Sequence, residues 1–451
     1  MNWRKPIINM LLSVTGSKVN KSLVTILNLE RQPRFVLKKY QETKLKKLIL
    51  HCYHKVPYYK RLLSQSKVVS KGRVNLSNYE KLPILTKEII RKESKNLRSR
   101  DIGKRKWYYN SSGGSTGEPI RFVQDRNYSD WNIANKIYYK TFVNQKIGDT
   151  ELRLWGSERD ILEGKDQLSI RLRNWLYNRK EFNAFRMSNK LMAHYLKEWN
   201  KFKPTWIEAY VQSIYEFAQF INRNNLRVHS PKGVLTAAGI LHPEMKQLIQ
   251  DVFNCPVFNR YGSREVGDMA CSCLINDSLH ISMWNQYIEI LDNELKHVKP
   301  GKSGKVYVTN LNNYSMPLLR YDIGDIADVP KKVTCDCGRN TELIKSIKGR
   351  EVHIFRTEED ELIDGEYFTH LFYLKDWVKK FQVVQHKLDQ IEIKVVLSQN
   401  KDQKDINYIN YAIRKVMGKN CRIQWNFVKD IPPLKSGKYL YTISKLKNVR
   451  D

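Results

Sequence analysis

The chain has 451 residues and a formal net charge of +33 at pH 7. This length is sufficient for a large core and at least two domains, and because no run of about 18 apolar residues occurs, we predict no membrane-spanning helix. Residues 1–100 carry 24 Lys and Arg against 5 Asp and Glu. This excess suits an anionic partner, such as nucleic acid, a lipid surface or an acidic polysaccharide intermediate, and a solvated basic face without a partner is the alternative.

Apolar residues at helical spacing dominate residues 1–105, most clearly between Phe35 and Leu63. Strand and helix patterns then alternate from about residue 107 to residue 260, which predicts α/β layers. The helices expected there span 129–141, 193–202, 214–222 and 242–253, with Ser213 as the cap of the third. The expected strands span 204–210 and 256–261.

Short strands are expected from 279 to 330, with a hairpin turn at 301–304. A small α+β part follows, with helices at 366–379 and 404–417 and strands at 381–386, 390–397 and 421–427. The expected division is a basic, mostly helical region (1–105), a central core (106–348) and a small C-terminal domain (349–451). The predicted fold class is α/β, with a large N-terminal domain of layered sheets and helices.

A stretch rich in glycine and hydroxyl groups spans residues 111–119 and has the sequence Ser-Ser-Gly-Gly-Ser-Thr-Gly-Glu-Pro. Glycine permits positive φ and close approach of backbone amides to a ligand, and the hydroxyls add donors, so the stretch could cradle polyphosphate oxygens. Its flanks, 106–109 and 120–123, are predicted strands. It lacks the lysine and the following helix of a Walker P-loop. A hydroxyl-rich hairpin turn is the alternative.

Further segments follow in a fixed order: Asn259–Gly267, Leu319–Asp325, Lys348–Arg350 and Pro433–Lys438. Together with 111–119, they resemble the motifs of the adenylate-forming superfamily of acyl-CoA synthetases. Within it, the chain is most similar to the phenylacetate–CoA ligase family and to its CapK-type branch of capsular polysaccharide biosynthesis. Glu118, in a position where most relatives carry Lys, and the opening helix around His51–Lys60 support this placement. The resemblance spans about residues 35–446.

The resemblance implies an enzyme that uses ATP and Mg²⁺ to join a carboxylate to AMP, with loss of pyrophosphate. Residues around the β- and γ-phosphates would be Ser111, Ser112, Gly113, Gly114, Ser115, Thr116 and Gly117. Glu265 would hold Mg²⁺, which prefers one or two carboxylates plus phosphate oxygens. Tyr261 would contact the adenine, and the same nucleotide-binding segment contains Gly262, Ser263 and Arg264.

By the same resemblance, Asp325 would accept hydrogen bonds from the ribose hydroxyls and Arg350 would contact ribose or phosphate. Lys438 would bridge the carboxylate and the α-phosphate from a C-terminal lid, so Glu265, Arg350 and Lys438 are the expected catalytic residues. Two alternatives are open. Asp322 and Asp325 could form an Asx turn at a strand end. Lys438 could be a solvent-facing lysine.

Three positions depart from the family pattern. Arg264 replaces a usual Thr, and it could bind a second anionic group or form a structural salt bridge. Val352 stands where relatives have a hinge Asp, and residues 236–240 give an unusual acyl-pocket wall. These departures leave the acceptor of the acyl group open between CoA and an amine.

The chain has seven cysteines and no recognisable signal peptide, so we expect free thiols in a reducing cytoplasm. In some relatives, a Cys-x₆-His and a Cys-x-Cys-Gly together hold a structural zinc. The positions that match are Cys273, His280, Cys335 and Cys337. Free thiols in turns are the alternative, and Cys271 would be spare. The isolated Cys52, Cys255 and Cys421 are expected to be buried small hydrophobes.

We therefore predict a cytoplasmic, AMP-forming carboxylate ligase that acts in bacterial surface polysaccharide biosynthesis. Its substrates would be a carboxylic acid and CoA or an amine, and its basic N-terminal region could contact the inner face of the membrane or polysaccharide intermediates. A catalytically idle nucleotide-binding paralogue, or a polyanion-binding protein, is the alternative. Nucleic acid is a poor candidate because no helix-turn-helix, zinc-finger or RNP signature occurs.

Overall fold

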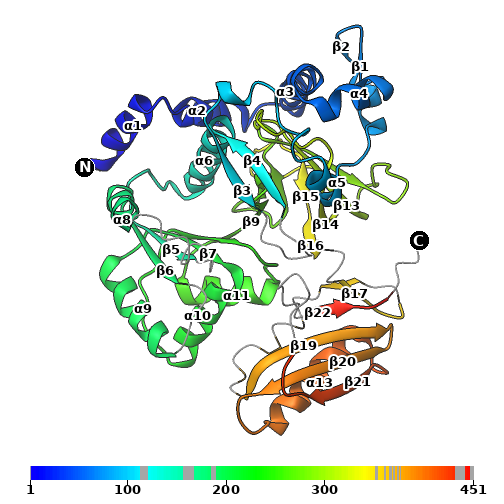
Figure 1. The fold of residues 1–451 in the computed structure, drawn as a ribbon. Coiled ribbons are helices and arrows are strands. Elements are labelled where there is room, and N and C mark those ends of the chain that lie inside the picture. The colour runs from blue at the N-terminus through cyan, green and yellow to red at the C-terminus, as the bar shows by residue number, and fades with distance from the viewer. Residues whose placement is uncertain are drawn as a thin grey trace. The chain divides into compact units, whose positions relative to one another are not determined.

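The computed structural model describes residues 2–111, 120–155, 167–183, 189–350, 354–359, 362–364, 368, 371–372, 375, 377–431 and 442–446. The chain divides into two compact units (Figure 1). Unit 1 contains residues 1–110, 121–323 and 328–346, and unit 2 contains 111–120, 324–327 and 347–451. The division at 105/106 and 348/349 stays a prediction. None of the helices in the described residues is long and apolar enough to cross a membrane.

The N-terminal part of unit 1 is helical, as expected. Its helices are α1 (Arg4–Val14), α2 (Val19–Leu29), α3 (Arg34–Lys55), α4 (Pro57–Gln65) and α5 (Lys87–Lys92), with short 3₁₀ turns at Leu76–Lys81 and Ile102–Lys104. Helices α3 and α4 confirm the pattern seen between Phe35 and Leu63. They are separate because Pro57 opens α4 and forces Val56 into an extended conformation. A small hairpin, β1 (Val69–Ser70) and β2 (Arg73–Val74), follows.

The larger sheet of unit 1 has the strand order β15-β11-β10-β9-β8-β7-β5-β6. Its strands are β5 (Glu151–Trp155), β6 (Arg179–Asn183), β7 (Trp206–Tyr210), β8 (Gly233–Ala237), β9 (Val257–Ser263), β10 (Gly267–Cys271), β11 (Leu279–Ile281) and β15 (Leu343–Ile344). Strands β5 to β9 pair in parallel, whereas β10, β11 and β15 continue the sheet with antiparallel pairs. The sheet therefore changes from parallel to antiparallel pairing between β9 and β10.

Helices cover both faces of this sheet, which confirms the predicted α/β class. On one face lie α9 (Asn189–Phe202), α10 (Val211–Arg223) and α11 (Pro243–Phe253), whose apolar side chains share a core with β5, β7 and β8. On the other face lie α2 and α6 (Arg126–Lys140), which pack around Trp206, Phe258 and Trp284. Helix α8 (Gln167–Leu176) precedes β6, and a 3₁₀ turn (Thr141–Val143) follows α6. Each of these layers buries one apolar face.

Most elements predicted between residues 107 and 260 are confirmed. Helices α6, α9 and α11 and strands β7 and β9 lie at the expected positions. The predicted cap of the third helix is wrong. Helix α10 starts at Val211 with Tyr210 as its N-cap residue, so Ser213 lies inside its first turn. The chain passes from β7 into α10 without a loop, which moves the start of the helix towards the N-terminus.

A second sheet is built on β12 (Gln286–Leu291), β13 (Ser303–Asn310) and β14 (Tyr321–Asp328), and residues 324–327 of β14 belong to unit 2. Strand β16 (Ser346–Arg350) begins where unit 1 ends. The bounds of the hairpin turn predicted at 301–304 are wrong. The chain reverses first at 292–296, where the Asp292 carboxylate accepts from the amides of Glu294 (2.9 Å) and Lys296 (3.0 Å). A second turn follows at 299–302, where the Lys302 amide donates to the Lys299 carbonyl oxygen at 3.1 Å and Gly301 has φ +85°. Ser303 already belongs to β13, so the glycine turn ends earlier than predicted.

The glycine- and hydroxyl-rich stretch is flanked by strands, as predicted. Strands β3 (Trp107–Ser111) and β4 (Arg121–Asp125) pair with each other. Residues 112–119 between them lie outside the described part of the chain.

Unit 2 contains a sheet with the order β21-β20-β19-β22, formed by β19 (Val378–Lys387), β20 (Gln390–Leu397), β21 (Arg422–Phe427) and β22 (Thr442–Ser444). Helix α13 (Gln403–Met417) packs its apolar face on this sheet. A small hairpin pairs β17 (Ile354–Arg356) with β18 (Leu362–Asp364). The predicted elements from 381 to 427 are confirmed. The end of the helix predicted at 366–379 is wrong, because Val378 already starts β19 and pairs with Leu397.

Candidate functional site

Glu265 lies on the tight turn between β9 and β10, at the point where the sheet becomes antiparallel. Glu265 is only 4% exposed. The turn is compact because Gly262 faces Asp268 across the two strands. A Cβ at Gly262 would stand 2.8 Å from the Gly267 carbonyl oxygen, and no side chain fits at that distance. Gly262 was singled out as part of a nucleotide-binding segment. The close packing of β9 against β10 also requires a glycine at this position.

A buried glutamine joins this turn to the base of the glycine- and hydroxyl-rich stretch. Gln124 on β4 donates from Nε2 to the carbonyl oxygens of Arg264 (2.8 Å) and Glu265 (3.2 Å). Its Oε1 accepts from Asn110 Nδ2 at 2.9 Å, and Asn110 is the residue before Ser111 on β3. Both strands that lead into residues 112–119 are thus bonded, through one amide side chain, to the turn that carries Glu265.

Other amide side chains fix the far side of the turn. Gln286 on β12 and Asn310 on β13 both donate to the Val266 carbonyl oxygen, at 2.7 and 2.9 Å. Asn132 on α6 accepts from the Asp268 amide at 3.0 Å. Because these partners come from three different elements and are held in the core, the backbone of the turn is preorganised rather than free to adapt. We call Asn110, Gln124, Asn132, Gln286 and Asn310 the amide clamp.

Tyr321 is the residue that contacts the Glu265 carboxylate directly. Its hydroxyl lies 3.3 Å from Glu265 Oε1, and the ring is completely buried at the start of β14. The preceding Arg320 has φ +50° and forms a buried double ion pair with Glu289, with nitrogen–oxygen distances of 3.0 Å. Burial raises the pKa of Glu289, and the charge of Arg320 opposes that shift. Arg320 therefore holds Tyr321 in place.

The remaining residues of the predicted nucleotide segment are placed as follows. Tyr261 is buried on β9, Ser263 is half-buried, and Arg264 is exposed. Among the described residues, the Arg264 guanidinium has no hydrogen bond or ion pair, so the structural salt bridge finds no partner there. Asp325 lies within β14 and is half-buried. The Asx-turn interpretation is wrong, because Asp322 and Asp325 are both strand residues.

A cluster of buried charges lies directly beside the turn. Arg260 on β9 pairs with Glu208 (2.6 Å) and lies 3.6 Å from Asp268, and Arg153 also pairs with Glu208 (2.8 Å). Burial opposes ionisation of Glu208, but the two arginines outweigh it and hold its pKa well below the usual range. Burial lowers the pKa of Lys136, against the attraction of Asp268. Asp268 Oδ2 has no hydrogen-bond partner among the described residues.

The structure brings the four predicted metal ligands together. One ligand atom from each of Cys273, His280, Cys335 and Cys337 lies within 4.8 Å of all the others. Cys273 Sγ is 3.6 Å from Cys335 Sγ, and Cys337 Sγ is 3.4 Å from His280 Nε2. Zinc bonds of about 2.3 Å to sulfur and 2.0 Å to nitrogen give tetrahedral ligand spacings of roughly 3.5–3.8 Å. The donor set and its spacing therefore fit a closed zinc site.

Neighbouring residues orient this Cys/His cluster. His280 Nδ1 lies 3.0 Å from Thr341 Oγ1, which leaves Nε2 facing the sulfur atoms. Burial, helped by the charge of Arg339, lowers the pKa of His280 to about 4, so the ring is neutral at pH 7. Arg339 in turn bonds to Glu30 Oε2 at 3.0 Å and to the Tyr138 hydroxyl at 2.9 Å, which connects the loop of Cys335 and Cys337 to α2 and α6.

All seven cysteines lie in the described part of the chain, and none of them forms a disulfide. Cys271 is buried in the core beside α6 and is not part of the Cys/His cluster. Cys52, Cys255 and Cys421 are buried, which confirms their interpretation as small core residues.

Several predicted site residues cannot be placed. Outside the described residues lie Ser112, Gly113, Gly114, Ser115, Thr116, Gly117, Val352 and Lys438. For Ser111 on β3 and Arg350 on β16, the backbone is described but not the side chain. Their roles stay predictions.

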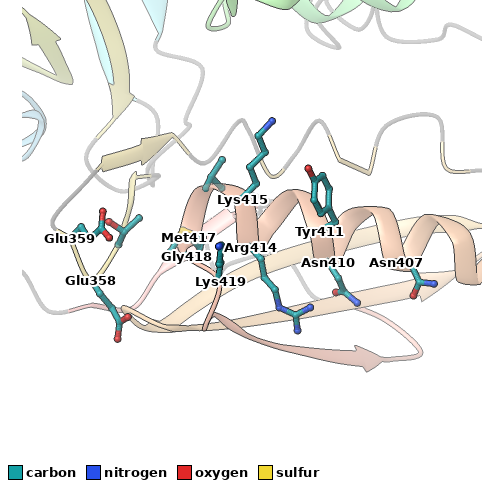
Figure 2. A pocket seen from close by; sticks show the side chains of 12 residues that line it. Glu358, Glu359, Asn407, Asn410, Tyr411, Arg414, Lys415, Met417, Gly418 and Lys419 are labelled. Atoms are coloured by element: carbon teal, nitrogen blue, oxygen red, sulfur yellow. The ribbon is translucent and has the colours of Figure 1, made fainter.

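A groove of about 910 Å³ on unit 2 contains none of the predicted site residues. It is lined by the C-terminal turns of α13 and by residues 357–359. Figure 2 shows Tyr411 and Lys415 pointing to one side of α13 and Arg414 to the other. The labelled charged side chains of α13 therefore do not converge on one point.

The amide clamp is the part of the candidate site that sequence reasoning missed. Tyr321 lies in the Leu319–Asp325 segment, but no role was assigned to it. All five clamp residues come from segments that no motif marks, and Asn310 begins the run Asn-Leu-Asn-Asn, which composition alone does not distinguish from a polar loop. One signal was available. Gln124 directly follows the predicted strand 120–123, which contains three β-forming residues, and a polar side chain that continues a buried strand needs a buried partner.

Comparisons with known proteins agree with the predicted family. Residues 355–445 match the CapK C-terminal domain family. Protein CapK of Staphylococcus aureus is 25% identical over 400 residues, with 86% of this chain and 85% of that protein covered. A phenylacetate-coenzyme A ligase from Thermus thermophilus is 22% identical over 397 residues, with coverages of 82% and 84%.

Comparison with solved structures identifies the fold. A 2-hydroxyisobutyryl-CoA ligase in the postadenylation state superposes with a TM-score of 0.67 at 16% identity and covers 92% of this chain and 91% of its own. An O-succinylbenzoate coenzyme A synthetase of Bacillus subtilis, in complex with ATP and magnesium ion, gives 0.50 at 14% identity, with coverages of 74% and 68%. The predicted resemblance and fold are thereby confirmed: the chain is similar to CapK and to phenylacetate-coenzyme A ligase, and it has the fold of the adenylate-forming CoA ligases.

Proposed function

We propose that the protein is an AMP-forming carboxylate ligase. A carboxylate oxygen attacks the α-phosphorus of ATP, the bond to the β-phosphate oxygen breaks, and pyrophosphate leaves. The acyl group of the resulting acyl-AMP then passes to CoA or to an amine, and AMP is released. The observation that carries this proposal is the preorganised turn of Glu265, which Gln124 and Asn110 bond to the base of the predicted phosphate-binding stretch.

The surroundings of Glu265 fit a Mg²⁺ ligand. The carboxylate is buried, and among the described residues it has the Tyr321 hydroxyl as a partner but no Lys or Arg within ion-pair distance. A buried carboxylate without a compensating charge is costly. A divalent cation shared with ATP phosphates would supply that charge and help to neutralise the phosphate oxygens.

The other predicted residues take the roles that the family pattern gives them. We propose that Tyr261 contacts the adenine, that Asp325 and Arg350 bind the ribose or phosphate, and that residues 111–117 surround the β- and γ-phosphates. Lys438 would bridge the carboxylate and the α-phosphate. The guanidinium of Arg264 is exposed and has no ion pair among the described residues, which supports the proposal that it binds an anionic group of a substrate.

We also propose that the Cys/His cluster holds a structural zinc. A Cys₃His set has no open coordination position, so the ion would stabilise the loop of Cys335 and Cys337 rather than take part in the reaction. Elemental analysis should find about one zinc per chain. Purified protein with no zinc, which also fails to bind added zinc, would contradict this assignment.

The biological role proposed here is in bacterial surface polysaccharide assembly, because the name and coverage of the CapK relative point to it. An idle nucleotide-binding paralogue is the competing function. Among the described residues, the buried Glu265 carboxylate has no Lys or Arg within ion-pair distance, and this argues against the idle paralogue, since a protein without the reaction has no need to keep a costly charge at that place. A polyanion-binding role would appear as heparin retention that ATP does not displace.

The test is carboxylate-dependent exchange of pyrophosphate into ATP, with aryl acids, fatty acids, amino acids and uronic acids. We expect exchange with one of these classes, and CoA and amines can then be offered as acceptors. ATP binding without exchange in any class would favour the idle paralogue.

A further inference from the structure

Helices α1 and α8 of unit 1 expose an unusual number of large apolar side chains. On α1, Met10 is 59% exposed and Val14 is 78% exposed, and on α8, Leu172 is 65% and Trp175 is 57% exposed. The full set is Trp3, Ile7, Met10, Leu11, Val14, Leu172 and Trp175, which we call the N-terminal apolar patch. Soluble monomers rarely leave such side chains together in water, and grouped exposure indicates a binding surface.

The two helices contribute to one continuous surface. The rings of Trp3 and Trp175 stand 5.8 Å apart, and Arg4 Nε donates to the Trp175 carbonyl oxygen at 3.4 Å. Along α1 the exposed residues recur at positions 3, 7, 10, 11 and 14, which is the spacing of one helix face. The described residues of α1 include one buried side chain, Ile8. The apolar face of α1 therefore points away from the core.

The start of α1 is fixed to the body of unit 1, so the patch is a built surface and not a frayed end. Asn2 Nδ2 donates to the Ile147 carbonyl oxygen and to Asp149 Oδ1, both at 2.9 Å. Gly148 makes this docking possible, because a Cβ there would lie 2.7 Å from Asn2 Oδ1 and 2.8 Å from Arg4 Cβ. The contact holds Trp3 beside Trp175.

The charges that accompany the patch are basic. Residues 1–29 contain Arg4, Lys5, Lys18 and Lys21 and no Asp or Glu, and residues 167–178 contain Arg171 and Arg173 and no acid. Two acids contact this segment, and both accept hydrogen bonds: Asp149 from Asn2 and from the Lys146 amide, and Asp130 from the Ser17 hydroxyl and the Lys18 amide. An apolar face with Trp and Leu, bordered by Lys and Arg, is the pattern of a helix that lies in a membrane interface.

We propose that the N-terminal apolar patch binds the surface of an anionic lipid bilayer, with α1 lying in the plane of the interface. The apolar side chains would enter the headgroup region, and the six basic residues would attract anionic headgroups. A second copy of the chain fits less well, since a twofold contact would place one set of Lys and Arg against another. With 11 residues, α1 is too short to span a bilayer.

Co-sedimentation with vesicles tests this proposal on the full chain. We expect binding to phosphatidylcholine vesicles that contain phosphatidylglycerol, much weaker binding to phosphatidylcholine alone, and weakening by salt. Met10→Glu should lower the partition coefficient by about tenfold or more, since it removes one inserted side chain and adds a negative charge. Phe35→Glu on α3 is the matched control, because Phe35 is 72% exposed and receives the same change in charge; it should leave binding nearly unchanged.

Circular dichroism melts show whether Met10→Glu still folds, and Val14→Glu is the second variant if it does not. Wild-type protein that stays in solution with anionic vesicles would overturn the proposal, as would equal losses for Met10→Glu and Phe35→Glu. Analytical ultracentrifugation tests whether a second copy of the chain binds the patch instead. If the wild-type protein does not bind vesicles and forms a dimer that Met10→Glu dissociates, the patch binds a second copy and the lipid assignment is overturned.

Discussion

The two ends of strand β10 hold two sites that are stabilised in different ways. At its start, the turn of Glu265 is fixed by the amide clamp, whose members come from β3, β4, α6, β12 and β13. Two residues beyond its end, Cys273 begins the Cys/His cluster, whose ligand atoms approach one another and have few side-chain hydrogen bonds within the described part of the chain, such as the contact of His280 with Thr341. The first site is organised by the folded chain itself, and the second has the geometry that a metal ion would complete.

This difference predicts that changes at the first end alter chemistry and changes at the second alter stability. Variants that separate activity from melting temperature therefore test the comparison directly.

The largest effect is expected at the carboxylate. Glu265→Gln keeps the size of the side chain and removes its charge, so adenylation should fall by about 10²-fold or more and should demand more Mg²⁺. The melting temperature should hold or rise, because a buried charge is lost. Exchange kinetics over a Mg²⁺ titration give the measurement. Tyr321→Phe is the matched control and should cost much less activity, and an unchanged Mg²⁺ titration in Glu265→Gln would remove Glu265 as a ligand.

The next effect concerns metal removal. Chelation, or Cys335→Ser, should lower the melting temperature by several degrees, because the folded state loses a ligand that stabilises it. The specific activity of the protein that remains folded should change little. Calorimetry and metal analysis give the readout, with Cys271→Ser as the control because Cys271 is not one of the four ligands. Immediate loss of adenylation without loss of folded protein would break the comparison.

Gln124→Leu removes the link between the turn and strands β3 and β4. The carbonyl oxygens of Arg264 and Glu265 would lose their buried donor, at a cost of about 1–3 kcal/mol. We expect adenylation to fall by roughly tenfold, since the turn can then shift by a small distance. Comparison of kcat and stability in the same preparation tests this, and a loss of stability with normal kcat would limit Gln124 to a structural role.

The smallest effect on adenylation is expected outside the ligand set. Thr341→Val keeps the shape of the side chain and removes the partner of His280 Nδ1. Zinc affinity should fall by about 10–100-fold while adenylation stays at the wild-type level. Competition with a chromogenic chelator measures the affinity. An affinity equal to that of the wild type would show that Thr341 does not orient the ring.

Local patterns were sufficient for much of the fold, and β20 was predicted within its observed bounds. For the Cys/His cluster the family resemblance was needed, because it named the four residues whose candidate ligand atoms the fold brings together. Errors arose where tertiary pairing decided the boundary, as at Val378, which pairs with Leu397 in β19 instead of continuing a helix.

The amide clamp was beyond sequence reasoning for a different reason. Gln124 and Glu265 are 141 residues apart, and no local pattern reveals that one bonds to the backbone of the other. The motif around Glu265 identifies a type of chemistry, but the residues that make its backbone rigid are spread over several elements. Their contribution depends on the register of the whole sheet.

The most direct test of the central claim is carboxylate-dependent pyrophosphate exchange, measured side by side on the wild-type protein and Glu265→Gln. The account predicts exchange in the wild type with one class of acid and a loss of about 10²-fold in the variant. Equal exchange in both proteins, or ATP binding with no exchange in the wild type for any acid, would contradict it.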